Sequence, residues 1–185
     1  MTKCKLSWLF IILASLSQHA EAADKQLNTI KASKALKNCG EVKLYWAKLI
    51  AIADVNFSAS NCDSFEAAKA SQNKSLAFLF KRNISAKFFN DAANESFRNN
   101  LALTESLTNQ LIKANEAFNE NYQSVQAGDI YLILQDANKG ITLYKNNTPL
   151  ATSTDPKLSR HYLNIWLGDK PAIKRLKKLL ILLFT

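Results

Sequence analysis

Histidine, cysteine and serine are the side chains in this sequence that most directly suggest chemistry. The chain holds two histidines and three cysteines, and a zinc site normally takes three or four such ligands. A zinc site would therefore have to gather most of these residues. Ser159 and His161 stand two residues apart in an expected helix, so their side chains point in different directions. We expect no metal site and no serine–histidine catalytic pair.

Glycine and charge limit the other classes of partner. Four glycines occur, in neither a GxxxxGK[ST] nor a GxGxxG string, so we expect no nucleotide cofactor. Lys and Arg number 24 against 15 Asp and Glu, a formal net charge of +9. These basic residues are scattered without an aromatic stripe, which argues against nucleic acid as a partner.

One basic cluster stands apart, in the last expected helix. It comprises Lys170, Lys174, Arg175, Lys177 and Lys178. The preferred interpretation is a helix that packs on the core and exposes its lysine face to solvent. The alternative is a basic amphipathic helix that lies on an anionic membrane surface.

The first 22 residues have the layout of a secretory signal peptide. Lys3 and Lys5 precede an apolar run over residues 6–16, and Ala20-Glu21-Ala22 follows as a small-x-small cleavage site. We expect residues 1–22 to be removed and residues 23–185 to be exported, to the periplasm in a Gram-negative bacterium. An uncleaved anchor is the alternative, although the run is shorter than the roughly 20 residues of a membrane span.

Cleavage would remove Cys4 and His19 and leave Cys39 and Cys62 as the cysteines of the exported chain. In an oxidising compartment such a pair forms a disulfide, which would stabilise the fold by about 3 kcal/mol. The alternative is two buried free thiols.

The remaining chain alternates strand and helix patterns, which predicts a single α+β domain over residues 23–185. Extended patterns cover residues 41–57 (with a bend near Ala47), 74–83, 130–134, 141–144 and 149–152. Helical patterns cover residues 85–100, 104–122, 155–166 and 169–183, with Ser85 and Asp155 as expected N-caps.

Five segments, in order, resemble those of bacterial chalcone-isomerase-like proteins. They are GEVKLYW at 40–46, FKRNI at 80–84, FNENY at 118–122 followed by Gly128-Asp129, GITLYKN at 140–146, and the D-P…I-W-L-G stretch at 155–168. The resemblance implies a chalcone-isomerase-like fold, in which helices cover one face of an antiparallel sheet and a cleft lies between them. The same fold serves plant chalcone isomerases and fatty-acid-binding relatives.

The catalytic pattern of the plant enzymes is not retained. Their helical Tyr, Lys and Asn fall on Phe89, Ala92 and Ser96, and their late Thr falls on Ile165. No arginine occurs in residues 41–57, where theirs would stand. Each lost donor of this kind costs roughly 2.7–4 kcal/mol of transition-state stabilisation. We therefore expect no catalytic residues and no chalcone isomerase activity.

The remaining cleft residues are candidates for ligand binding: Arg82, Tyr45, Trp46, Phe89, Tyr144 and Trp166. The aromatic ones could line a pocket for an acyl chain, or could simply form the core. Arg82 shares the strand parity of Phe80, which predicts a partly buried guanidinium. Such a group needs a carboxylate partner, either on a ligand or, as preferred, in an internal salt bridge with Asp54 or Asp129.

We therefore expect an exported binding protein that takes a small apolar or fatty-acid-like carboxylate ligand. One alternative is an isomerase or lyase that uses the same cleft with acid–base residues near Arg82 and Tyr144. The other is a module that contacts a membrane surface or a partner protein through the basic closing helix.

Overall fold

A six-stranded antiparallel sheet forms the frame of the computed structural model, which describes residues 36–46, 49–101 and 105–185. The strands are β1 (Lys37–Trp46), β2 (Ile50–Ala59), β3 (Lys74–Phe80), β4 (Ile130–Asp136), β5 (Gly140–Lys145) and β6 (Thr148–Ser153). They lie in the sheet in their order along the chain. The expected signal peptide at residues 1–22 lies outside the described residues.

The first long strand pattern is a hairpin rather than one strand. β1 and β2 pair antiparallel from Lys37 opposite Ala59 to Trp46 opposite Ile50. The bend expected near Ala47 lies outside the described residues, between the paired ends Trp46 and Ile50. The prediction of a single bent strand was wrong because the side-chain pattern is extended on both sides of a turn, and pairing the two halves satisfies their backbone hydrogen bonds.

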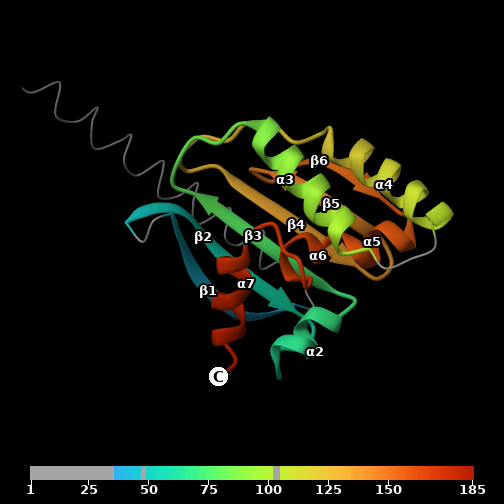
Figure 1. Ribbon diagram of the computed structural model, residues 1–185. Coiled ribbons are helices and arrows are strands. Elements are labelled where there is room, and N and C mark those ends of the chain that lie inside the picture. Colours follow the sequence, from blue (N-terminus) through green and yellow to red (C-terminus); the bar gives the residue numbers. More distant parts are fainter. Residues whose placement is uncertain (1–35, 47–48, 102–104) are drawn as a thin grey trace, which may run out of the picture. The chain divides into compact units, whose positions relative to one another are not determined.

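Six helices are described: α2 (Phe65–Ala70), α3 (Ala86–Asn99), α4 (Glu105–Asn119), α5 (Pro156–Tyr162), α6 (Asn164–Leu167) and α7 (Lys174–Leu182). Ser85 caps α3 and Asp155 caps α5, each through its side-chain oxygen, as predicted. The expected helix over 155–166 is divided into α5 and α6 at Leu163. α3 and α4 cross in front of the sheet in Figure 1, with α6 beside them. The predicted α+β fold, a sheet covered on one face by helices, is confirmed.

Alternate strand residues build the core between the sheet and the helices. Val55, Phe78 and Tyr131 face one another across β2, β3 and β4, and all are buried. They belong to one cluster with buried residues of the helices, among them Phe97, Leu111, Leu158, Ile165 and Leu176. The parity of the strands therefore decides which residues can reach a site on the helix side of the sheet.

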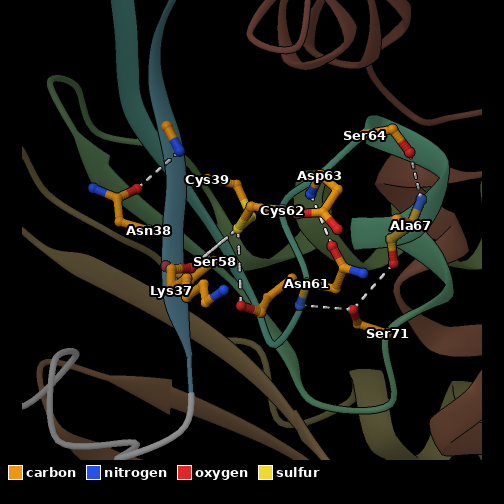
Figure 2. The surroundings of a disulfide bond; sticks show 12 residues. Lys37, Asn38, Cys39, Ser58, Asn61, Cys62, Asp63, Ser64, Ala67 and Ser71 are labelled. Atoms are coloured by element: carbon orange, nitrogen blue, oxygen red, sulfur yellow. Dashed lines mark hydrogen bonds between the residues drawn. A yellow bond between two sulfur atoms is a disulfide. The ribbon is translucent and has the colours of Figure 1, made fainter.

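A disulfide joins the two cysteines of the predicted pair, with the Cα atoms of Cys39 and Cys62 5.2 Å apart. Figure 2 shows that it links β1 to the loop that precedes α2. Beside it, the backbone N–H of Asn61 donates to Ser71 Oγ at 3.3 Å, and Ser71 Oγ donates to the carbonyl oxygen of Ala67 at 3.0 Å. The disulfide and the Asn61–Ser71 bond hold the loop before α2, and Phe65 of α2 packs against Phe57 of β2.

Among the described residues, no helix combines the length and the hydropathy that crossing a membrane requires.

Candidate functional site

An apolar cavity of about 90 Å³ lies between the sheet and helices α3 and α6. Strand residues that line it include Leu44, Phe78, Phe80 and Ile133, and helix residues include Phe89, Ala92, Ile165 and Trp166. No charged side chain lines it among the described residues. The cavity is therefore suited to apolar groups.

Aromatic rings form the part of the wall nearest the start of α3. The ring of Phe89 lies 5.3 Å from Phe80 and 5.4 Å from Tyr131, centroid to centroid, in edge-to-face contacts. Trp166, from α6, lies 5.8 Å from Phe78. Phe88 also lines the cavity and is 61% exposed, so the cavity reaches solvent beside this side chain.

Two tyrosines, Tyr122 and Tyr131, line this wall, and the hydroxyl group of each already has hydrogen-bond partners. Tyr162 donates to Asn119 Oδ1 at 2.7 Å, so Tyr122 is the donor in its 3.0 Å bond to the hydroxyl of Tyr162. The hydroxyl of Tyr131 donates to the carbonyl oxygen of Gln123 and accepts from its N–H at 2.8 Å.

Burial raises the pKa of Tyr131 to about 12 and the pKa of Tyr122 well above its ordinary value. Both phenols are consequently neutral near pH 7. Neither supplies a base or a free donor to a bound molecule.

Three of the four positions onto which the resemblance places donors of the plant enzymes line this cavity, and these three are apolar. Phe89, Ala92 and Ile165 all stand in its wall. Ser96 does not line it, because its Oγ lies 2.9 Å from the carbonyl oxygens of both Ile165 and Lys170 and holds α3 to the α6–α7 segment. The described residues of the wall therefore offer no free donor that could polarise a carbonyl or stabilise a phenolate.

The six predicted ligand-binding residues divide between the cavity and other places. Phe89 and Trp166 line it. Tyr45 on β1 and Tyr144 on β5 are half-buried and do not line it. Trp46 ends β1, and its side chain lies outside the described part of the structure.

The prediction that the Arg82 guanidinium is partly buried was wrong. β3 ends at Phe80, and the chain bends at Lys81 and Arg82 before Ile84 pairs with Val125. The alternation therefore stops short of Arg82, whose side chain is exposed.

The two acidic residues expected to pair with Arg82 have other partners. Asp54 Oδ2 lies 2.7 Å from Lys81 Nζ, and Asp129 Oδ2 lies 3.3 Å from Lys145 Nζ. Arg82 has no ion pair within the described ranges.

Several lining residues were not singled out from the sequence, among them Leu44, Phe80 and Tyr131. The signal that could have found them is strand parity, because all three share the helix-facing parity of Val55 and Phe78 across four strands. Their convergence depends on the register, which the patterns alone do not fix. Over residues 36–46, 49–101 and 105–185, no group of three or more His, Cys, Asp or Glu side chains could hold a metal ion.

Comparison with known proteins agrees with this architecture. A family model described as chalcone isomerase-like matches residues 42–181. A search of curated protein sequences gave no significant match. Among solved structures, the fatty-acid binding protein AtFAP1 of Arabidopsis thaliana superposes with a TM-score of 0.52 and 11% sequence identity, covering 81% of this chain and 88% of that chain. At this identity the likeness shows the fold alone.

Proposed function

Because this chain belongs to the chalcone isomerase-like family, we propose that it is an exported, non-catalytic protein that binds a small apolar ligand between its sheet and α3. The observation that carries the proposal is the cavity wall, which is apolar at three positions onto which the resemblance places donors of the plant enzymes. A wall of this kind favours burial of hydrocarbon and gives no assistance to a polar transition state.

The size of the cavity restricts how a ligand enters. A cavity of about 150 Å³ holds a benzene ring, whereas this one measures about 90 Å³. An acyl chain therefore needs side chains of the wall to move, and Phe88, which is largely exposed, is the one least held by its surroundings.

The lack of charged residues among the described part of the wall indicates how a fatty-acid-like ligand would lie. Since no charged residue lines the cavity among the described residues, a carboxylate would remain outside, with the chain inside. Arg82 is exposed and lies two residues before Ile84, which lines the cavity, so it is the cation we assign to the carboxylate. The fatty-acid-binding function named for the Arabidopsis neighbour supports this ligand class.

Export is supported by the signal-peptide pattern of residues 1–22 and by the disulfide between Cys39 and Cys62. Disulfides persist in oxidising compartments and are rare in the cytosol. Mass spectrometry of the secreted protein tests this directly, with an N-terminus at Ala23 as the expected result.

The binding proposal is tested by calorimetric titration with dodecanoate and with the neutral dodecanol. Ala92→Leu fills the cavity from α3, and we expect it to lower the affinity for both ligands at least tenfold. Ala117→Leu makes the same change at an exposed position of α4 and should leave the affinity unchanged. Equal binding by the two variants, or no binding by the unmodified protein, would overturn the proposal.

The enzymatic alternative receives no support from this geometry. It required acid–base residues near Arg82 and Tyr144 in the cleft, and neither residue lines the cavity. We expect chalcone to cyclise in the presence of the protein no faster than in buffer, as measured by the loss of chalcone absorbance.

A second candidate function rests on α7. This helix buries Leu176 and Leu180 but leaves Ile181 and Leu182 38% and 56% exposed. They border a surface hollow that is also lined by Lys174, Lys177 and Lys178, a combination that favours anionic lipid surfaces. Sedimentation with phosphatidylglycerol vesicles, but not phosphatidylcholine vesicles, that is lost in Ile181→Ser/Leu182→Ser would support contact with a membrane. Equal recovery with both vesicles would exclude it.

A further inference from the structure

A second, polar cavity lies on the helix side of the sheet at the opposite end of β3. Its volume is about 560 Å³, and it is bordered by α2, the start of β3, the turn after β4, and α5. This volume lies within the roughly 300–1,000 Å³ of small-molecule sites. It has no lining residue in common with the apolar cavity.

A buried lysine forms part of its wall. Lys74, the first residue of β3, is 5% exposed, and its Nζ donates to the carbonyl oxygen of Ser71 at 2.7 Å. An ammonium group can donate three hydrogen bonds, and Lys74 has no ion pair within the described part of the chain. Buried charges in proteins are normally paired, so this ammonium lacks the anion that would compensate its burial.

A buried amide stands directly across the strand pair from this lysine. Gln135 of β4 is opposite Lys74 in the sheet register and is 7% exposed. Its Oε1 is buried without a hydrogen-bond partner. An unsatisfied buried polar atom costs about 1–3 kcal/mol, and Gln135 lines a cavity large enough to admit a partner for its amide.

The other charged side chains of the wall leave the cavity with an excess of positive charge. Lys69 and Glu66 of α2 pair with each other at 3.7 Å. Asp136 accepts backbone N–H bonds from Asn138 and Lys139, which holds it in the β4–β5 turn. Arg160 of α5 is exposed and has no ion pair within the described residues. Lys74 and Arg160 are therefore the two cations of the wall that lack a carboxylate partner.

We propose that this cavity binds a small organic anion, a carboxylate or a phosphate ester, whose negative charge pairs with Lys74 and whose polar groups meet the amide of Gln135. Its volume fits a metabolite rather than a single inorganic ion. Arg160, at the exposed side of the cavity, provides a second contact for the same anion. The proposal concerns a separate site and stands whether or not the apolar cavity binds a ligand.

The pKa of Lys74 gives the site a specific signature. Burial, together with the charge of Lys69, lowers this pKa to about 8. An anion binds the protonated form, so affinity should fall as the pH rises from 7.5 to 9.5. The other charged groups that face the site are Glu66, Asp136 and Arg160, and all three remain when Lys74 is replaced. Lys69 is the other amine at the wall, and its contribution remains when Lys74 is replaced.

The test is calorimetric titration with citrate and with glucose 6-phosphate, with glucose as the uncharged control. We expect at least one of the two anions to bind, and glucose not to bind. Lys74→Met keeps the length of the side chain and removes its charge, and should weaken binding at least tenfold and abolish its dependence on pH. Lys43→Met makes the same change at an exposed position of β1 and should leave binding intact.

A second readout needs no variant. In the unmodified protein, the side-chain amide resonances of Gln135 should shift on titration with the binding anion, and the backbone amides of α3 should not. Failure of both anions to bind, or binding that survives Lys74→Met at every pH, would overturn the proposal. Binding of citrate alone or of glucose 6-phosphate alone identifies the carboxylate or the phosphate ester as the recognised group.

Discussion

The two ends of β3 show how one face of a sheet can carry two different environments. At the Phe80 end, aromatic rings close a cavity of about 90 Å³ in which both tyrosine hydroxyls have partners. At the Lys74 end, a cavity of about 560 Å³ is lined by Lys74 and Gln135, whose ammonium group and amide oxygen have no carboxylate partner and no donor among the described residues. The buried polar groups therefore have hydrogen-bond partners at the apolar end, whereas at the polar end some of them do not.

The two ends also differ in what holds them together. Packing of large rings from β3, β4, α3 and α6 holds the apolar end. The polar end is closed by the short helix α2, which follows a loop held by the disulfide and by the bond from the Asn61 N–H to Ser71 Oγ (Figure 2). A covalent link there adds to the packing of two buried residues of α2, Phe65 and Ala68, in the core.

Removal of the disulfide should give the largest effect, and should affect one end only. We expect Cys39→Ser/Cys62→Ser to lower the free energy of unfolding by about 3 kcal/mol, because the link closes a loop between residues 23 positions apart. Urea denaturation measures this change. Hydrogen exchange should accelerate in α2 and not in α3, and equal acceleration in both helices would contradict the assignment of the disulfide to the polar end.

At the apolar end, Phe89→Ala tests whether ring packing holds the wall. Phe89 is half-buried, so we expect a loss of about 2 kcal/mol in the free energy of unfolding, below the roughly 3–5 kcal/mol of a fully buried phenylalanine. Phe88→Ala, one residue away and largely exposed, is the matched control and should stay within about 0.5 kcal/mol. Similar losses in both variants would show that Phe89 has no special place in the wall.

The titration of Lys74 at the polar end should make the free energy of unfolding depend on pH. The pKa of Lys74 is lowered to about 8 from 10.5, so between these values the unfolded chain binds more protons than the folded one, and stability rises with pH. From pH 8 to 9.5, the contribution of Lys74 to this gain should be about 1.5 kcal/mol. Urea denaturation at each pH measures it, and Lys74→Met should abolish it. The same slope in Lys74→Met would mean that another group is responsible.

The accuracy of the predicted helices and strands depended on how clearly the sequence marks their ends. Segments with clear caps, such as α3 after Ser85 and α5 after Asp155, were predicted to within a residue at their starts. The β1–β2 hairpin was missed because its turn lacks the glycine signals of a tight turn.

The alternation of inward and outward side chains along a strand predicts the wrong side for Arg82 at one end of β3 and the right side for Lys74 at the other. It placed Arg82 inside, but the strand ends two residues earlier. Applied in the other direction from Leu76, it places Lys74 on the core face, where the structure has it buried. Parity is reliable only inside a strand, and the bounds of a strand depend on its pairing partners, which the local sequence does not specify.

The prediction with the smallest expected effect tests where β3 ends. Lys81 is paired with Asp54 at a partly exposed site, so Lys81→Ala should lower the free energy of unfolding by about 0.2–1 kcal/mol. Arg82→Ala, the neighbouring change, should stay within about 0.5 kcal/mol because the side chain is exposed. Combining each with Asp54→Asn in a double-mutant cycle isolates the pairwise energies. A coupling between Asp54 and Lys81 together with none between Asp54 and Arg82 is the expected result. The reverse would mean that β3 extends past Phe80 in solution and that Arg82 takes up the buried position that alternation predicts.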